Sequence, residues 1–439
     1  MSINPEVIEE NFGLNVVLNV VSKDNLKALD AKSYDGIAVT HRSEASTFTN
    51  VSGFGLNIDR YLVSAASGSP SDEATFGRLV TGKDQIRTRF PKKVEDLPQM
   101  LDRTLELAAS THHLTEHSWA SKMRPLRDVR RKQHLFEMLI QKLQAKDFDR
   151  SSLVLPESVN NLELYGYRFG SRTKGQLFYT LDWKSYFDSI GGEENFTAED
   201  FQRAIVHVVA GPDETSLFRW KLFPKCVYAE IDEGGWTYFL HEGRWYEVRA
   251  DFLEQLDKEI GDLFEQNRSL PECNGMNEDE YNKFLYENSK GHYAFMHRRQ
   301  LTNFQNGEFC DLYGEDKQML FVKNYAGSGD LGHLFNQGVT SATLLKRKPA
   351  YRNDVNIHLP PSHQFTNPLD SIRPEEFEIR YVIIKTGRDK SDQLPLFSRI
   401  RLQEASETLK NLGYPIKVEI VPGVAKPPEN PPLPKSKRK

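Results

Sequence analysis

One stretch, residues 307–341, constrains the fold of this chain more than any other. Residues 309–313 form an apolar run that contains Asp311, and a charged turn follows at residues 314–317. A second apolar run ends at Lys323, and a glycine-rich loop then leads into a helical pattern that contains Gln337. Two short apolar runs joined by a charged turn predict a β-hairpin, so we expect Asp311 and Lys323 on neighbouring strands.

This spacing suits metal-dependent cleavage of a phosphodiester. Such a site needs acidic oxygens to hold a metal ion and a cation to offset the charge that develops on the phosphate. Mg²⁺ binds one or two carboxylates and completes its shell with water and substrate oxygens. Asp311 would supply the first carboxylate and Lys323 the cation, while Glu280 would add a carboxylate from the preceding predicted helix and Gln337 would reach the same pocket from the following one.

The order of acid strand, turn, lysine strand and helix resembles the PD-(D/E)xK nuclease superfamily over residues 275–345. The resemblance implies a restriction-endonuclease-like mixed sheet flanked by helices. In that motif an acid stands two residues before the lysine, where this chain has Phe321. Glu308 is our candidate for a migrated carboxylate, so Asp311, Glu308 and Glu280 form the predicted Mg²⁺ site. Without such a replacement the site would bind nucleic acid without cutting it, and an ordinary hairpin with a surface Asp and Lys also fits the pattern.

A second resemblance covers nearly the whole chain. The sequence is similar to a sporadically distributed bacterial family of unknown function that occurs on mobile and defence-associated loci. The matching motifs include Glu10-Asn11-Phe12-Gly13-Leu14, Gly82-Lys83-Asp84, Trp245-Tyr246, Cys310-Asp311-Leu312 and His333-Leu334-Phe335. The setting of that family implies a nucleic-acid-directed role in defence against foreign DNA, with other defence-system proteins as partners.

The charge balance limits how nucleic acid could bind. The formal net charge is -5, so binding would need a local basic face. Two short basic runs are candidates, and a solvated helix face is the alternative interpretation of the first. The candidate nucleic-acid-binding residues are Arg127, Arg130, Arg131, Lys132, Arg298 and Arg299.

Composition excludes several classes of protein. A hydrophobic share of 38% excludes a fully disordered chain, and no apolar run approaches the ~18 residues of a membrane span. The three cysteines lie far apart, so we expect reduced thiols in a cytoplasmic protein, with neither a zinc site nor a disulfide framework.

The periodicity predicts an α+β, multi-domain chain. We expect an α/β domain over residues 1–150, a mainly antiparallel, aromatic-rich region over 151–270, a nuclease-like α/β domain over 271–421 and a disordered basic tail over 422–439. Residues 6–30 read as helix, and residues 222–231, 236–240 and 245–248 read as strands of a meander.

Overall fold

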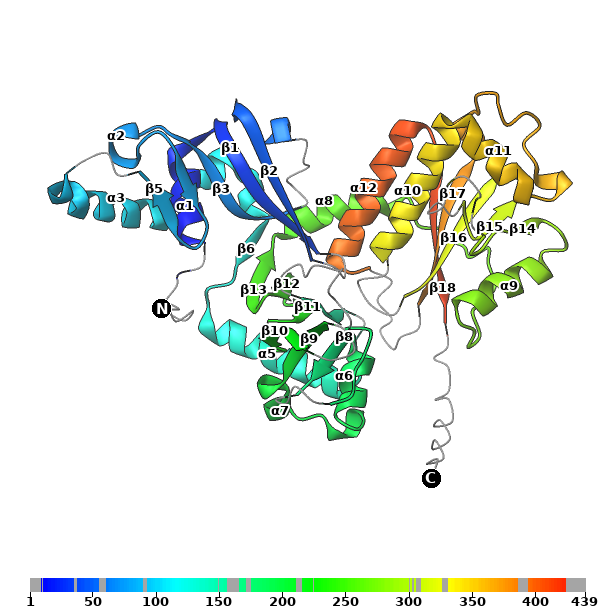
Figure 1. Cartoon of the computed structure of the whole chain (residues 1–439), viewed down its shortest axis with the longest axis horizontal. Coiled ribbons are helices and arrows are strands. Elements are labelled where there is room, and N and C mark those ends of the chain that lie inside the picture. The colour runs from blue at the N-terminus through cyan, green and yellow to red at the C-terminus, as the bar shows by residue number, and fades with distance from the viewer. Residues whose placement is uncertain are drawn as a thin grey trace. The chain divides into compact units, whose positions relative to one another are not determined.

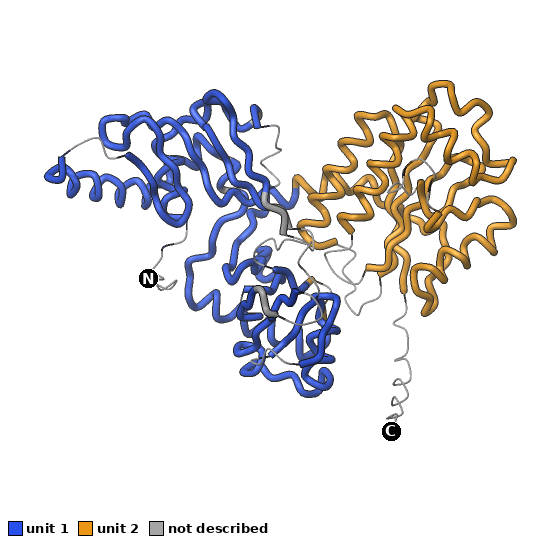
Figure 2. Tube along the Cα trace, in the orientation of Figure 1, with its two compact units in different colours: residues 1–146, 151–254 blue, residues 147–150, 255–439 orange. Residues whose placement is uncertain are grey.

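The structure is a computed structural model, and its contacts divide the chain into two compact units (Figure 2). Unit 1 comprises Met1–Lys146 and Ser151–Glu254, and unit 2 comprises Asp147–Arg150 and Gln255–Lys439. Both units combine helices and sheets, which confirms the predicted α+β, multi-domain class. The structure describes residues 9, 11–34, 38–54, 61–89, 93–148, 150–155, 166–170, 175–210, 215–223, 225–299, 301, 304, 309–325, 331–385 and 394–423.

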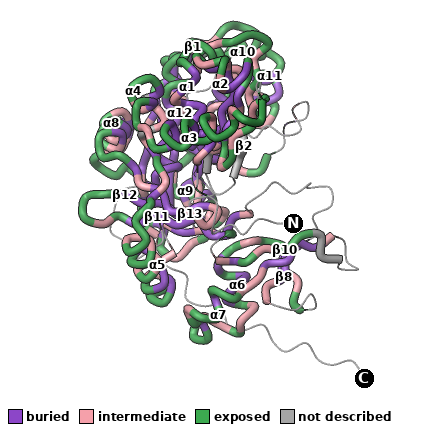
Figure 3. The backbone as a smooth tube through the Cα atoms, turned by 90° about the vertical axis from the view of Figure 1, so that its left-hand side faces the viewer, coloured by how far each residue is buried: buried purple, intermediate pink, exposed green. Residues whose placement is uncertain are grey.

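The first sheet of unit 1 has the order β2-β1-β3-β4-β5 and is antiparallel (Figure 1). Its strands are β1 (Val21–Tyr34), β2 (Ala38–Thr49), β3 (Leu62–Pro70), β4 (Val80–Gly82) and β5 (Ile86–Thr88). Helix α1 (Phe12–Val20) packs on it, and the short helix α2 (Glu73–Phe76) follows β3. Helix α3 (Leu97–Ala109) buries only part of one face, and exposed residues dominate the rest of it (Figure 3).

The helix predicted over residues 6–30 is wrong beyond Val20, because β1 begins at Val21. The pairing of β1 with β3 shifts register between Leu26 and Ala28 and again between Asp30 and Ala31. A β-bulge interrupts the strict two-residue alternation of a strand. The buried Leu26 and Leu29 are therefore three residues apart, which imitates the spacing of a helical face.

Two further antiparallel sheets complete unit 1. One has the order β6-β13-β12-β11-β7 and the other β10-β9-β8. The strands are β6 (Met123–Pro125), β7 (Ser151–Leu153), β8 (Gly166–Phe169), β9 (Ile205–Ala210), β10 (Thr215–Lys221), β11 (Val227–Glu233), β12 (Trp236–His241) and β13 (Arg244–Val248). The last three form the predicted meander, although its first strand begins at Val227 and not at residue 222.

Further helices lie between or after these strands, and the last of them extends from unit 1 into unit 2. They are α4 (His113–Glu116), α5 (Val129–Gln144), α6 (Trp183–Ser189), α7 (Ala198–Arg203) and α8 (Ala250–Gly261), with 3-10 turns at Val51–Phe54, Val94–Asp96, Ser118–Ser121 and Glu193–Asn195. Asp128 accepts hydrogen bonds from the backbone N–H groups of Arg130 and Arg131, at 2.8 and 3.1 Å, and so caps α5.

Unit 2 is built on one mixed sheet in the order β14-β15-β16-β17-β18. Its strands are β14 (Tyr293–Phe295), β15 (Leu312–Gly314), β16 (Gln318–Tyr325), β17 (Glu378–Lys385) and β18 (Ile416–Pro422). The first three form an antiparallel meander, and β16, β17 and β18 run parallel. Parallel neighbours need crossover connections, and here helices supply them.

Helices cover both faces of this sheet (Figure 1). Helices α10 (Leu331–Arg347), α11 (Pro349–His358) and α12 (Leu396–Leu412) contribute to the larger core, and α9 (Glu278–Asn288) contributes to the smaller one. Further 3-10 turns lie at Pro361–His363 and Pro374–Glu376.

The predicted regions and the compact units divide the chain differently. Strand β6, from the predicted region 1–150, pairs with β13 of the predicted region 151–270, so one sheet contains both. The whole predicted region 271–421 lies in unit 2, together with Gln255–Leu270. The predicted tail, residues 422–439, falls outside the described residues from residue 424 onward.

Candidate functional site

The hairpin of unit 2 holds Asp311 and Lys323 on neighbouring segments. Asp311 directly precedes β15, and its backbone N–H donates to the carbonyl of Leu320 at 2.9 Å. Its carboxylate Oδ2 accepts from the backbone N–H of Val322 on β16 at 2.7 Å. Lys323 is the next residue of that strand. Asp311 is buried, with 7% of its surface exposed, so its charge needs partners inside the protein.

His297 is the main partner of Asp311. Its Nδ1 hydrogen-bonds Asp311 Oδ1, and its Nε2 lies 2.8 Å from Asp279 Oδ1 on α9. The hydrogen bond with Asp311, and after it the one with Asp279, raises the pKa of His297 to about 9 against the opposing effect of burial. The imidazole is therefore protonated at neutral pH and donates from both nitrogens. Arg298 adds a second cation, with its Nη1 2.8 Å from Asp279 Oδ2.

Lys323 has its own acidic partner on α9. Its Nζ lies 3.1 Å from Glu278 Oε2, and the same carboxylate accepts from the backbone N–H of Asn324 at 3.2 Å. Both side chains are about one quarter exposed. Glu278 and Asp279, in the first turn of one helix, thus reach two different cations.

Glu280 serves the helix itself. Its Oε2 accepts from the backbone N–H of Asn277 at 2.8 Å, and its own N–H donates to the Asn277 side chain at 2.9 Å. This reciprocal pair is a capping box. The carboxylate of Glu280 is held against the helix backbone, although the sequence analysis assigned it to the metal site.

Phe321 lies in the hydrophobic core where the nuclease motif has an acid. Its side chain is 2% exposed, and its ring centroid lies 5.9 Å from that of Tyr381. Tyr381 is itself fixed by donating its hydroxyl to the carbonyl of Phe335 at 2.9 Å. An ionised carboxylate at position 321 would be desolvated among these rings.

The described carboxylates of the predicted Mg²⁺ site have protein partners. Both carboxylate oxygens of Asp311 are engaged, by His297 and by the backbone N–H of Val322, and Glu280 caps its helix. Within the part of the chain that the structure describes, no group of three His, Cys, Asp or Glu side chains is arranged to hold a metal ion. Glu308 lies outside the described residues, so its predicted role as a ligand stays a prediction.

The remaining candidates are dispersed. Gln337 is a half-buried residue of α10. Arg127 lies 3.5 Å from Glu9, and Arg130 and Lys132 follow in the first turn of α5. Arg131 pairs with Glu233 at 2.8 Å and stacks over the Tyr238 ring. Arg299 donates to the carbonyl of His358 at 3.4 Å.

Sequence reasoning missed Glu278, Asp279 and His297 as members of the cluster. The acids lie in a predicted first helical turn, where they favour the helix dipole whatever else they contact. His297 lies in the basic run before the hairpin. The sequence does show an acid pair before β14 and a histidine after it. Spacing along the chain does not show that β14 pairs with β15, which brings these three residues close to the hairpin of Asp311 and Lys323.

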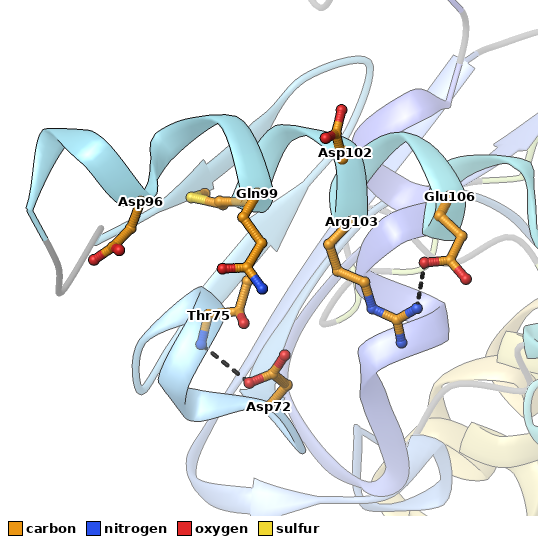
Figure 4. Close-up of a pocket in the computed structure, with 8 residues that line it drawn as sticks. Asp72, Thr75, Asp96, Gln99, Asp102, Arg103 and Glu106 are labelled. Atoms are coloured by element: carbon orange, nitrogen blue, oxygen red, sulfur yellow. Dashed lines mark hydrogen bonds and ion pairs between the residues drawn. The ribbon is translucent and has the colours of Figure 1, made fainter.

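A second acidic surface lies in unit 1 and lacks a comparable organisation. A cavity of about 450 Å³ between α2 and α3 is lined by Asp72, Asp96, Asp102 and Glu106 (Figure 4). Asp72 accepts from the backbone N–H of Thr75 at 3.0 Å, and Glu106 pairs with Arg103 at 2.6 Å. Figure 4 shows Asp102 pointing away from Asp72. Asp72 and Glu106 thus have separate partners, and the described acids of this cavity form no group arranged to hold a metal ion.

Comparisons with known proteins place the chain in a family whose function is unknown. The model of a family of unknown function (DUF6119) matches residues 1–422. No curated protein matches the chain, and no solved structure matches it. Within the described residues, no helix has the length and apolar character needed to cross a membrane.

Proposed function

We propose that this chain, which belongs to the family of unknown function DUF6119, binds nucleic acid. The nuclease-like cluster of unit 2 does not cut the nucleic acid in this proposal. One observation carries this proposal. Asp311 and Lys323 lie on neighbouring segments of a mixed sheet, yet Phe321 fills the core at the third position and each charge already has an internal partner.

In this proposal, exposed arginines on each unit supply phosphate contacts of their own. Arg298 is 69% exposed and Arg127 67% exposed, and Arg130 and Arg299 are exposed as well. Guanidinium groups suit phosphate recognition because their planar donors match phosphate oxygens. Such contacts release counterions, so binding should weaken steeply as salt rises.

The test is fluorescence anisotropy with a fluorescein-labelled DNA duplex of about 20 base pairs at a series of NaCl concentrations. The Arg298→Ala, Arg299→Ala double variant should weaken binding and lower the salt slope by about 2, because each lost phosphate contact lowers it by about 1. Arg268→Ala is the matched control, since Arg268 is 48% exposed and pairs with Glu272 on the same unit. Wild-type protein that shows no salt-dependent binding would refute the proposal.

A metal-dependent nuclease with Mg²⁺ is the second candidate. The observation that favours it is the gathering of Glu278, Asp279 and Asp311 around His297 and Lys323. Cleavage that depends on Asp311 would select this candidate over binding alone. A role in bacterial defence, with partner proteins of that system, stays a prediction of the family resemblance. The cytoplasmic location stays a prediction from the three widely spaced cysteines.

A further inference from the structure

Two adjoining hollows in unit 1 are lined by different kinds of side chain, mainly charged in one and partly apolar and aromatic in the other. The first has a volume of about 190 Å³ and lies between the β2-β1-β3-β4-β5 sheet and the β6-β13-β12-β11-β7 sheet. The second has a volume of about 300 Å³. Asn11, Leu62 and Val63 line both hollows, so the two are neighbours. Together they fall within the ~300–1,000 Å³ range of small-molecule sites.

The smaller hollow is built around two ion pairs. Arg244 holds Asp84 with two hydrogen bonds, of 3.1 and 2.8 Å, and Lys32 lies 2.5 Å from Glu242. Burial acts to raise the pKa of Asp84, but the hydrogen bonds from Arg244 and from the Asn11 backbone lower it by more. Burial likewise opposes the ionisation of Glu242, yet His241 and Lys32 lower its pKa to about 2. Both acids are therefore charged at neutral pH and neutralise one cation each.

Two further lysines give the smaller hollow a net positive charge. Lys83 and Lys225 line it and are exposed. Among the residues that the structure describes, no carboxylate lies within 4.0 Å of either ammonium group. The lining thus holds four cations, Lys32, Lys83, Lys225 and Arg244, against two anions, Asp84 and Glu242. A small anion would balance the two excess positive charges.

The backbone around Lys83 is held rigidly. Leu14 N–H donates to the carbonyl of Lys83 at 2.7 Å, and Lys83 N–H donates to the carbonyl of Gln85 at 3.0 Å. A Cβ added at Gly82 would lie 1.9 Å from the carbonyl oxygen of Gly13, so only glycine permits this approach of α1 to the β4–β5 turn. The start of α1 and the turn that carries Lys83 therefore form one fixed wall.

The larger hollow is amphipathic and partly aromatic. Tyr61 and Trp119 line it together with the apolar Leu14 and Leu18. The half-buried Trp119 ring is braced edge to face by His117, with 5.5 Å between the ring centroids. Arg124 and Arg127 lie at the same hollow. Aromatic and guanidinium planes of this kind stack on nucleobases, whose faces are all flat and polarisable.

We propose that the two hollows hold one nucleoside phosphate, with the phosphate against Lys83 and Lys225 and the base in the hollow lined by Tyr61 and Trp119. This site lies in unit 1 and does not depend on the cluster in unit 2. The shared chemistry is a nucleotide, which free mononucleotides and the end of a nucleic-acid strand both provide. A strand end would also suit the function proposed above.

The experiment is isothermal titration calorimetry of the full chain with AMP, adenosine, inorganic phosphate and a 5′-phosphorylated single-stranded oligonucleotide. AMP should bind more tightly than adenosine or phosphate alone, since it fills both hollows. Lys83→Ala and Lys225→Ala should each weaken AMP about tenfold and leave adenosine unchanged. The exposed Lys23 on β1 lies outside both hollows, and Lys23→Ala should change nothing.

Trp119→Leu tests the base half of the site. Leucine keeps much of the volume but removes the stacking face, so both AMP and adenosine should weaken while inorganic phosphate does not. Thermal unfolding of each variant shows whether the fold is kept. Because the chain has five tryptophans, the part of the AMP-induced quenching of tryptophan fluorescence that is lost in Trp119→Leu reports the base. Tighter binding of the oligonucleotide than of AMP would assign the site to strand ends.

Three results would overturn the proposal. The first is no binding of AMP or the oligonucleotide by folded wild-type protein. The second is that inorganic phosphate binds as tightly as AMP and that Trp119→Leu does not change the affinity for AMP. The third is an equal loss of AMP binding in Lys23→Ala and Lys83→Ala.

Discussion

The charged clusters of the two units differ in whether each charged side chain is paired with an opposite charge. In unit 2, Asp311 and Asp279 share the protonated His297, and Lys323 pairs with Glu278. In unit 1, two ion pairs hold two sheets together while Lys83 and Lys225 remain beside them without a carboxylate among the described residues. A cluster whose charges pair internally leaves no charge for a ligand, whereas a cluster with an excess of one sign attracts a ligand of the other.

Burial explains why the two clusters differ. The side chains of His297 and Asp311 are 8% and 10% exposed, so an unpaired charge there would be costly. Lys83 and Lys225 are exposed, and water compensates their charges without a partner. The comparison leads to four predictions, given from the largest expected effect to the smallest.

Removing the shared cation of unit 2 should have the largest effect. His297→Ala leaves the buried carboxylate of Asp311 without its ion partner, and breaking a buried pair in this way costs about 3 kcal/mol or more. Urea unfolding measures the loss. His292→Ala is the control, because His292 is 40% exposed and lies 3.5 Å from Asp316. Equal stability of the two variants would show that the Asp311–His297 pair does not support the fold.

The same pair should make stability depend on pH. The folded pKa of His297 is raised to about 9, above its unfolded value of about 6.5. Its contribution is therefore complete below about pH 6.5 and is lost as the pH rises through 9. The urea midpoint of wild-type protein should fall over this range by the equivalent of about 2 kcal/mol more than that of His297→Gln. Parallel pH profiles of the two proteins would contradict the assigned ionisation.

Breaking an ion pair of unit 1 should cost less. Asp84→Asn removes the charge that Arg244 holds, in a pair whose side chains are 21% and 26% exposed. We expect a loss of about 1.5 kcal/mol, between the values for surface and buried pairs. Asp251→Asn serves as a control because its pair with Arg249 is far more exposed. A loss as large as that of His297→Ala would remove the distinction between the clusters.

The lysines of unit 1 should matter least for stability. Lys83→Ala should change the free energy of unfolding by less than about 0.5 kcal/mol, because an exposed lysine without an ion partner contributes little. Its effect should appear only in AMP binding. A stability loss of about 1 kcal/mol or more in thermal unfolding would show that Lys83 belongs to the scaffold.

Sequence reasoning works best where residues that are close along the chain are also in contact in the fold. The Asp311 hairpin and the meander of β11, β12 and β13 follow directly from local periodicity and turns. It fails at β1, where bulges displace Leu26 and Leu29 into a helical spacing.

The members of the unit 2 cluster were harder to predict for a different reason. Glu280 has the same charge as Glu278 and Asp279, and only the capping box decides which acids turn toward the sheet. His297 joins Asp311 across two strands that pair only in the folded protein. The two ion pairs of unit 1 join residues 160 and 210 positions apart, a separation that no local pattern records.

The most direct test of binding without cleavage is incubation of supercoiled plasmid with the full chain in Mg²⁺ and, separately, in Mn²⁺. We predict that the plasmid is retarded in a native gel at low salt and that it is still supercoiled after the protein is removed. Nicked or linear plasmid formed by wild-type protein, and not by Asp311→Asn or Lys323→Ala, would contradict this prediction and identify the cluster as an active nuclease site.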